Sequence, residues 1–417
     1  MYVDASEARV PLHRHHFLAG ATVALALVAV WLPITLIVYA RLTAPTAAQR
    51  AAIAVVSPWT PPPPGENGFT ILKALRDRDG DWPTSATCRD AESCIERVRS
   101  NEAQFSAAIR EHAAVLDEAE RALRAPIFRN PVRDVTIDAV LPPFQIVMRL
   151  PLVRAQAHVM GERTAALAAT CRDAGDFVRW SRDHDSVIHA MIAAEGFAQS
   201  AALIAEMRQA EPAGELPQAC VPLLEIPDPA ADGLICDGAR TEWRVFSSWL
   251  PGLQSDGSFE QPSLWAALTH HPEQFSGRLA ERFAGFCGVD AANDARDDGI
   301  DLLRIDPAPR AIDRIAFPVT DIMAEDTGGA TYVRYWERQL DLIALRRLLA
   351  ATLRVGPVRD ADEAAARFAA LPPSLRDGPR PLQLDADGRS LVVILRAERF
   401  EPIGGAMRFG LPVHGKE

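Results

Sequence analysis

Six cysteines are the residues of this chain whose type and number indicate chemistry most directly. They are Cys88, Cys94, Cys171, Cys220, Cys236 and Cys287. An even number of cysteines predicts disulfide bonds if the chain is exported, because a cytosolic protein keeps its thiols reduced. We expect the pairs Cys88–Cys94 and Cys220–Cys236, which close short loops, and the pair Cys171–Cys287 from the remainder. Other connectivities stay open, since six cysteines allow many.

Metal-binding motifs are absent from the sequence. No Cys-x-x-Cys pair and no His-Glu-x-x-His motif occurs, which argues against zinc. Asp77–Asp81 carries carboxylates at alternate positions, but Trp82 and Cys88 stand where an EF-hand loop needs glycine and glutamate. The aspartates of the acidic stretch 290–303 have no spacing that closes a ligand cage. We therefore expect no metal and no cofactor.

Catalytic motifs are equally absent, so the catalytic residues stay unknown. The chain has no Gly-x-Ser-x-Gly elbow and no phosphate-binding loop. His184 and His189 lie five residues apart, and His270 and His271 precede a proline, so neither pair has the spacing of a helical metal face. Paired carboxylates for glycan hydrolysis depend on a separation in space that a sequence does not show. These absences favour a non-enzymatic protein.

An uncharged run of 24 residues, from Phe17 to Ala40, dominates the N-terminal part. A helix of this length spans roughly 36 Å, more than the ~30 Å of a hydrocarbon core. Transmembrane helices tolerate a residue such as Pro33 better than soluble helices do. Tyr39 is placed to anchor the helix at the membrane interface, whereas Trp31 is too central. The run predicts a transmembrane anchor over residues 17–40.

A cleaved signal peptide is the alternative to a retained anchor. Val38-Tyr39-Ala40 fits a cleavage site, but the apolar part of a signal peptide usually has about 7–15 residues. Arginines flank both ends of the run equally, so the positive-inside rule does not orient it. The short tail 1–16 and the six cysteines decide the orientation. We expect a cytoplasmic tail, an inner-membrane anchor and a periplasmic body.

Composition and charge exclude some partners. The 417 residues are 48% hydrophobic and 24% charged, as in globular proteins, and carry a net charge of −11. An acidic body has no electrostatic attraction to nucleic acids or anionic lipids. No basic stripe with interleaved aromatic residues occurs either. We expect no nucleic-acid partner.

The first half of the body is predicted to be helical behind a spacer. Residues 41–66 are rich in proline and alanine, and Pro61 to Pro64 favour an extended polyproline linker. After a short helix over 67–78, apolar residues recur at helical spacing from Ala91 to Arg124 and predict one long helix with Asp90 as its N-cap. Residues 126–143 contain four prolines and are predicted to be extended.

Residues 144–207 are predicted to be helical with breaks near Pro151, Gly161 and Asp183–Asp185. The stretch PLVRAQAHVMGERTAALAATCRDAGDFVRW has the character of a single tetratricopeptide-like helix pair. No second copy follows at that repeat's spacing, so an irregular helical bundle fits as well.

The second half is predicted to end in a small β element. A proline-rich connection spans 211–233 and an acidic loop spans 290–303. Helices are predicted over 231–250, 263–268, 272–286, 331–355 and 361–371. The widest apolar surface belongs to 331–355, which should lie centrally. Apolar runs around Asp387-Gly388 predict a hairpin, and MRFGLPV adds a possible third strand. We divide the chain into the tail, anchor and linker, a helical domain 67–372 and a β-containing element 373–417.

Three stretches of the sequence resemble uncharacterised, membrane-anchored exported proteins of Gram-negative bacteria. They are ENGFTILKAL, ALRAPIFRNP and LPPFQIVMRLPLVRAQAHVMGERTAALAAT. The matching positions are Asn67, Gly68 and Phe69 at the start of the body and Pro142, Pro143, Phe144 and Gln145 before the central helices. The resemblance spans about half of the chain and implies location and architecture. It implies no activity.

Together these features predict a membrane-anchored periplasmic helical protein that binds or scaffolds another cell-envelope protein. Two alternatives remain. The body could be an envelope hydrolase whose carboxylates converge only in the fold, or a sensor of a small ligand. A pair of carboxylates about 5–10 Å apart in a cleft would favour the hydrolase. An apolar pocket of several hundred cubic ångströms would favour the sensor.

Overall fold

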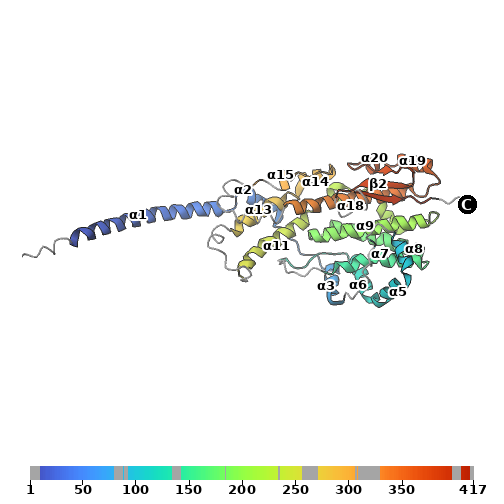
Figure 1. Cartoon of the computed structure of the whole chain (residues 1–417), viewed down its shortest axis with the longest axis horizontal. Helices are drawn as coiled ribbons and strands as arrows, with labels where there is room; N and C mark the ends of the chain where they lie inside the picture. The colour runs from blue at the N-terminus through green and yellow to red at the C-terminus, as the bar shows by residue number, and fades with distance from the viewer. Residues whose placement is uncertain are drawn as a thin grey trace, which may run out of the picture.

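The structure is a computed structural model that describes residues 10–78, 88, 93–133, 142–183, 185–232, 235–255, 271–305, 308, 329–396 and 405–413. Helices predominate, and the described strands form a three-stranded antiparallel sheet near the C-terminus (Figure 1). The prediction of a mostly helical protein with a small β element is confirmed.

The α-helices are α1 Val10–Thr43, α2 Ala47–Val56, α3 Gly68–Lys73, α4 Cys94–Ser100, α5 Glu102–Glu111, α6 Ala113–Arg124, α7 Leu150–Val159, α8 Arg163–Arg182, α9 Val187–Ala210, α10 Pro229–Asp232, α11 Cys236–Ser255, α13 Pro272–Ala284, α14 Gly288–Arg296, α15 Leu302–Ile305, α18 Gly329–Val355, α19 Ala361–Ala369 and α20 Pro373–Arg376. Short 3-10 helices span Arg76–Arg78, Phe144–Arg149 and Gln218–Leu224, and the strands are β1 Gln383–Leu384, β2 Ser390–Ile394 and β3 Ala406–Gly410.

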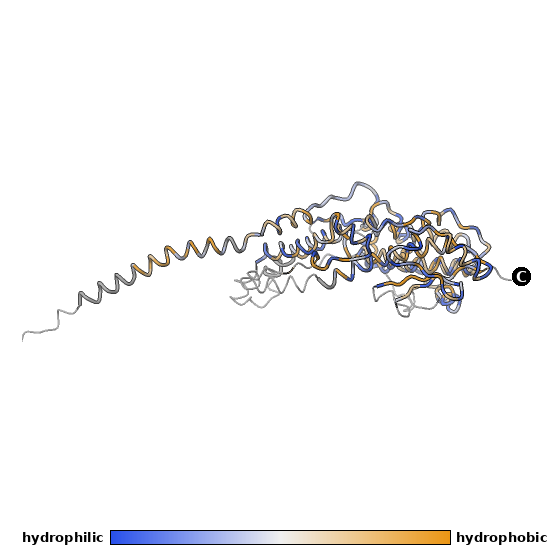
Figure 2. Tube along the Cα trace, turned by 90° about the horizontal axis from the view of Figure 1, so that it is seen from above, coloured by the Kyte–Doolittle hydropathy of each residue, from blue (hydrophilic) through white to orange (hydrophobic). Residues whose placement is uncertain are grey.

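Helix α1 extends from the body as a long apolar rod (Figures 1 and 2). Its window Thr22–Tyr39 is long and apolar enough to cross a membrane and is 0% buried. Trp31 and Tyr39 are exposed, and α1 continues through Pro33. Phe17 and Ala40 belong to α1, but their side chains lie outside the described part. Helix α9 has a comparable length and composition, but 72% of its window is buried, which is typical of a core helix.

The C-terminal end of α1 is held against the body. The side-chain amide of Gln274 donates to the carbonyl oxygens of Thr43 and Ala44 at 3.0 and 2.8 Å. The Tyr39 hydroxyl lies 2.7 Å from Nε2 of His271. These contacts join the last turns of α1 to the start of α13. The end of α1 therefore packs directly against the body, without an extended linker between them.

The predicted linker over residues 41–66 is wrong where α2 forms. The side chains of Thr46 and Gln49 cap the helix reciprocally, and this capping box starts α2 immediately after α1. Helix α2 packs along α13, where Gly277 leaves room for Gln49: a Cβ atom there would lie 3.0 Å from the Gln49 side chain. Residues 57–66, which include Pro61 to Pro64, remain outside helices.

Two hydrophobic cores form the body, and α18 contributes to both. The small core lies between α2, α11, α13, α14 and the first half of α18, with Trp336 buried in it. The large core gathers α3 to α9, the second half of α18 and the sheet, with Leu345 and Leu349 fully buried. The central position predicted for residues 331–355 is confirmed, because α18 is the element that both cores share.

The helix predicted from Ala91 to Arg124 is three helices in the structure. Helix α4 ends where the Asn101 side chain donates to the carbonyl oxygen of Arg97, and α5 and α6 meet at His112. Ser93 is the N-cap of α4, whereas Asp90 lies outside the described residues. The helical spacing of apolar residues continues across these breaks, which is why the sequence pattern did not reveal them.

The breaks predicted within residues 144–207 are confirmed. A 3-10 helix precedes Pro151 at the start of α7, Gly161 has a φ of +96° between α7 and α8, and α8 ends before Asp183. The acidic stretch 290–303 was predicted to be a loop, which is wrong for its first part. There α14 forms, and Ala291 and Ala295 on one side of it are buried in the small core.

The predicted hairpin and third strand are confirmed. Strand β2 pairs with β1 and β3, with Leu391 opposite Phe409, and Gly388 has a φ of +68° in the turn. A buried ion network joins this region to α18. Arg380 pairs with Asp341 and, at 2.7 Å, with Asp298.

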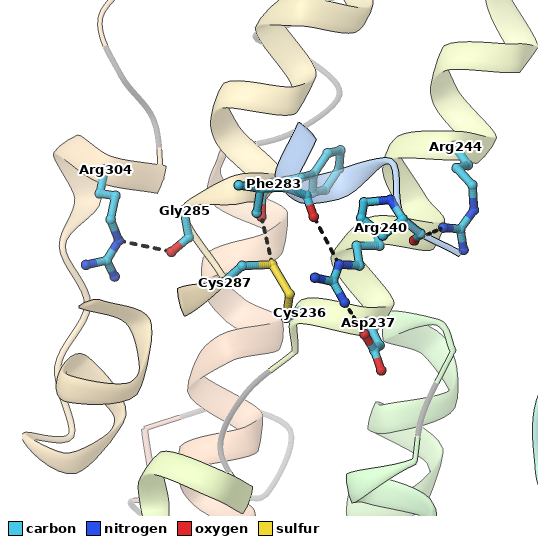
Figure 3. The surroundings of a disulfide bond; sticks show 10 residues. Cys236, Asp237, Arg240, Arg244, Phe283, Gly285, Cys287 and Arg304 are labelled. Atoms are coloured by element: carbon cyan, nitrogen blue, oxygen red, sulfur yellow. Dashed lines mark hydrogen bonds and ion pairs between the residues drawn. A yellow bond between two sulfur atoms is a disulfide. The ribbon is translucent and has the colours of Figure 1, made fainter. Parts of the chain in front are cut away.

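The cysteine pairing is correct for one predicted bridge and wrong for two. Cys88 pairs with Cys94, as predicted. The other bridges are Cys171–Cys220 and Cys236–Cys287, not Cys220–Cys236 and Cys171–Cys287. Figure 3 shows the Cys236–Cys287 bridge. Cys220 lies in the large core beside α8, whereas Cys236 starts α11 at the small core. Their closeness in sequence therefore does not bring them together.

Candidate functional site

A cleft lined by three arginines lies where the two cores meet. We call it the arginine cleft, and its volume is about 150 Å³. Four segments line it: the chain after α2, the chain after α6, the residue before Ser186 and the first turns of α11. The lining residues are Pro58, Trp59, Thr60, Arg129, Asn130, Val132, Asp185, Asp237, Arg240, Thr241 and Arg244.

Protein acceptors fix the guanidinium groups of the cleft. Arg129 pairs with Asp183 at 2.6 Å, and Arg240 pairs with Asp237 at 2.9 Å. Arg240 also donates to the Val55 carbonyl at 3.1 Å. Figure 3 shows Arg240 and Asp237 beside the disulfide. These contacts use only part of the five N–H donors of each guanidinium, so the groups are held in place with donors left over.

Arg244 differs from its two neighbours because it has no carboxylate partner among the described residues. It donates to the Thr241 hydroxyl at 2.6 Å and to the Pro58 carbonyl at 3.3 Å. Its Nε atom is buried and has no hydrogen-bond partner among the residues that the structure describes. Burial lowers the pKa of Arg244. Asp185 and Asp237 act on Arg244 electrostatically without forming an ion pair, so its guanidinium can still donate to an incoming anion.

Two helix N-termini add to the positive character of the cleft. Helix α9 starts after Ser186, its N-cap, and α11 starts at Cys236. The N-terminal end of a helix carries a partial positive charge. Asp185 and Asp237 in the lining and Asp183 beside Arg129 offset the charge of the three arginines, so the positive character rests on the unused N–H donors of the guanidinium groups and on the helix ends.

The motif Asn67-Gly68-Phe69 positions Arg129. The Asn67 amide donates to the Arg129 carbonyl at 2.7 Å, and its oxygen accepts the Arg129 N–H at 3.3 Å. Gly68 is required there, because a Cβ atom would lie 2.2 Å from the Ala122 carbonyl oxygen. Two of the three stretches that carry the sequence resemblance therefore meet at the cleft, since Arg129 and Asn130 belong to ALRAPIFRNP.

An aromatic cluster with one histidine lies beside the cleft. The His189 ring lies 4.4 Å from Phe128 and 5.3 Å from Trp180, measured between ring centroids. Its Nδ1 atom lies 3.6 Å from the Asp185 carboxylate, but the side chain is 1% exposed and its Nε2 has no described partner. His189 is thus enclosed by rings and does not reach the cleft. His184, its neighbour in the sequence prediction, lies outside the described residues.

Glu242 lies next to the cleft, one residue beyond the lining residue Thr241, and its pKa is raised. Burial raises the pKa of Glu242 to about 7, although it accepts hydrogen bonds from the Tyr332 hydroxyl at 3.2 Å and from the N–H of Val187. In the unfolded chain its pKa is 4.5. Between these pH values the folded protein holds a proton that the unfolded chain releases, so stability falls as pH rises through this window.

Replacement of Glu242 by glutamine should remove this pH dependence. We expect the free energy of unfolding of native protein to fall by about 1–3 kcal/mol between pH 4 and pH 8 because of this group. Water that reaches the half-buried side chain reduces the size of this effect. The variant should be more stable than native protein at pH 8 and equal to it at pH 4. Urea unfolding at both pH values measures this difference. The exposed Glu215→Gln is the control, and equal effects of both variants would contradict the assignment.

The arrangement is suited to binding an anion. No group of three or more metal-ligating side chains occurs within the described residues, and the six cysteines are all in bridges. The sequence analysis missed the arginines of the cleft. The spacing of Arg240 and Arg244, four residues apart on one helix face, was the available signal. Comparisons of this chain with protein-family models, with curated proteins and with solved structures find no match.

Proposed function

We propose that this protein is anchored in the inner membrane of a Gram-negative cell by residues 17–40 and that its periplasmic body binds another envelope protein. The exposed apolar window of α1 supports the anchor. The three disulfides support an oxidising compartment for the body and, with it, a cytoplasmic tail 1–16. The contact of the Tyr39 hydroxyl with Nε2 of His271 supports an anchor that is retained, because cleavage after Ala40 would remove Tyr39.

The arginine cleft is the observation that carries the binding function. Arginine binds carboxylates through two parallel hydrogen bonds, and fixed guanidinium groups lose little conformational entropy on binding. Trp59 adds an aromatic surface at the rim. Arginine and tryptophan are enriched where protein interfaces concentrate their binding energy. The partner is therefore a protein that presents Asp or Glu side chains to the cleft.

The distance of the cleft from the bilayer favours a protein over lipid headgroups. Helices α2 and α13 run in the same direction, because Gln274 contacts Thr43 before α2 and Val56 ends α2 in the small core with Phe283. The cleft begins at Pro58, so the length of α2 alone places it about 15 Å beyond the end of α1. This separation favours a protein partner over the headgroups of the protein's own membrane.

The finer architecture belongs to the same proposal. Helices α7 and α8 form a hairpin at Gly161, with Ala155, Ala166 and Ala174 buried, and we regard them as a single tetratricopeptide-like pair. The resemblance to membrane-anchored exported proteins is supported by the convergence of two of its stretches, at Asn67 and Arg129. It leaves the identity of the partner open.

Site-specific crosslinking in intact cells tests the proposal. A photoreactive residue at Trp59 of the full chain should give a discrete adduct with one envelope protein, and the same residue at Val221 should not. Arg240→Glu and Arg244→Glu together should reduce the Trp59 adduct at least tenfold, because charge reversal repels an acidic partner. Arg172→Glu, on the exposed side of α8, is the matched control.

Two results would contradict the proposal. The first is a Trp59 adduct that persists undiminished in the charge-reversed variant. The second is a C-terminal alkaline phosphatase fusion that is inactive, because this reporter folds only in an oxidising compartment. The first result removes the role of the cleft, and the second removes the location.

A further inference from the structure

The C-terminal ends of α9 and α18 lie away from α1 (Figure 1). A second cavity is lined by residues from these two ends and from the chain after each of them. We call it the distal cavity, and its volume is about 400 Å³. Ligand pockets have volumes of roughly 300–1,000 Å³. Most of its lining is apolar, from Ala205, Pro212, Ala213, Leu216, Leu353 and Pro357.

Arg208 is the cation that lines the distal cavity. Its side chain is 7% exposed, and its Nη1 donates to the Gly214 carbonyl at 2.6 Å. It makes no ion pair with a described residue, although Glu211, which pairs with Arg163 at 2.7 Å, also acts on it electrostatically. A buried guanidinium with a carbonyl as partner keeps most of its donors available. Burial lowers the pKa of Arg208.

A purely structural role explains only part of this arrangement. The bond to Gly214 fastens the turn after α9, and a cation near the C-terminal end of a helix is favourable. Neither effect requires a largely apolar cavity of this size beside the guanidinium. A buried charge is costly when no ion pairs with it, and a carboxylate that entered the cavity would remove that cost.

We propose that the distal cavity binds a small amphiphilic carboxylate. The carboxylate group would accept hydrogen bonds from Arg208, and the apolar part would lie between Leu216 and Leu353. The volume accommodates a chain of about six to ten carbon atoms. This site is separate from the arginine cleft and does not depend on the proposed partner. It adds recognition of a small ligand to a protein that binds another protein.

Calorimetry with the full chain in lipid nanodiscs tests the site. Hexanoate is the probe, and hexanamide is its neutral counterpart of the same length, with empty nanodiscs as the blank. We expect hexanoate to bind at least tenfold more tightly than hexanamide. Arg208→Gln should remove this preference, and Arg172→Gln, an exposed arginine on α8, should retain it.

A second variant separates binding from folding. Ala213→Trp, in an exposed part of the lining, should fill the cavity and abolish hexanoate binding while Arg208 is unchanged. The double variant Arg240→Glu with Arg244→Glu should bind hexanoate as native protein does, so failure of the cleft proposal is distinguishable. Equal binding of hexanoate and hexanamide, no binding at millimolar hexanoate, or unchanged binding by Ala213→Trp would overturn the proposal.

Discussion

Replacement of Asp341 by alanine should lower the free energy of unfolding by about 3–5 kcal/mol. Asp341 is 0% exposed in the middle of α18, where its carboxylate pairs with Arg380 and accepts the N–H of Arg396 at 3.0 Å. Arg380 is itself buried, and Asp298 is its other carboxylate. Without Asp341, Arg380 keeps only Asp298, which Arg396 also contacts at 2.9 Å, so two arginines share one carboxylate and one positive charge is left without a partner in this network. The uncompensated charge, rather than the lost attraction, accounts for most of the effect.

Urea unfolding followed by circular dichroism measures this change. Asp377→Ala is the matched control, because Asp377 pairs with Arg376 at the surface and such pairs contribute about 0–1 kcal/mol. The double variant Asp341→Leu with Arg380→Met should be more stable than Asp341→Ala alone, since it buries no unpaired charge. A loss below about 1 kcal/mol for Asp341→Ala would contradict this prediction, because it would mean that water solvates the charged groups of the network.

Removal of the Cys236–Cys287 bridge should have the second-largest effect, about 3–4 kcal/mol. The bridge joins residues 51 positions apart and holds the start of α11 next to α14. Its loss enlarges the conformational freedom of the unfolded chain. It also frees the first turn of α11, which carries Asp237 and Arg240. We therefore expect Cys236→Ala with Cys287→Ala to weaken the Trp59 crosslink as well as the fold.

The choice of cysteine pairs checks the connectivity directly. Cys236→Ala with Cys287→Ala should leave no free thiol, because the two replaced cysteines form one bridge and the other four stay paired. Cys220→Ala with Cys236→Ala, which the sequence pairing treats as one bridge, should expose two free thiols and destabilise the protein more. Thiol labelling of the denatured, non-reduced variants distinguishes these outcomes. Two free thiols in the first variant would contradict the pairing in the structure.

Local patterns predicted most of the elements. The spacing of apolar residues predicted α9 and α18, and Asp387-Gly388 predicted the β1–β2 turn, because each signal lies within one element or one turn. The same signals failed at Asn101 and His112, where the apolar spacing continues across a helix break. They also failed at residues 47–56, where the nearby prolines suggested a spacer and the Thr46 capping box was overlooked.

The sequence by itself determined the apolar N-terminal helix, the helical class and the C-terminal strands, since these depend on neighbouring residues. Only the tertiary structure decided the partners of Cys220 and Cys236, because they lie against different helices. It also decided which arginines converge: Arg129 and Arg244 come from distant segments that meet where the two cores join. A binding site built from distant segments is determined by the packing of helices, so patterns of neighbouring residues do not predict it.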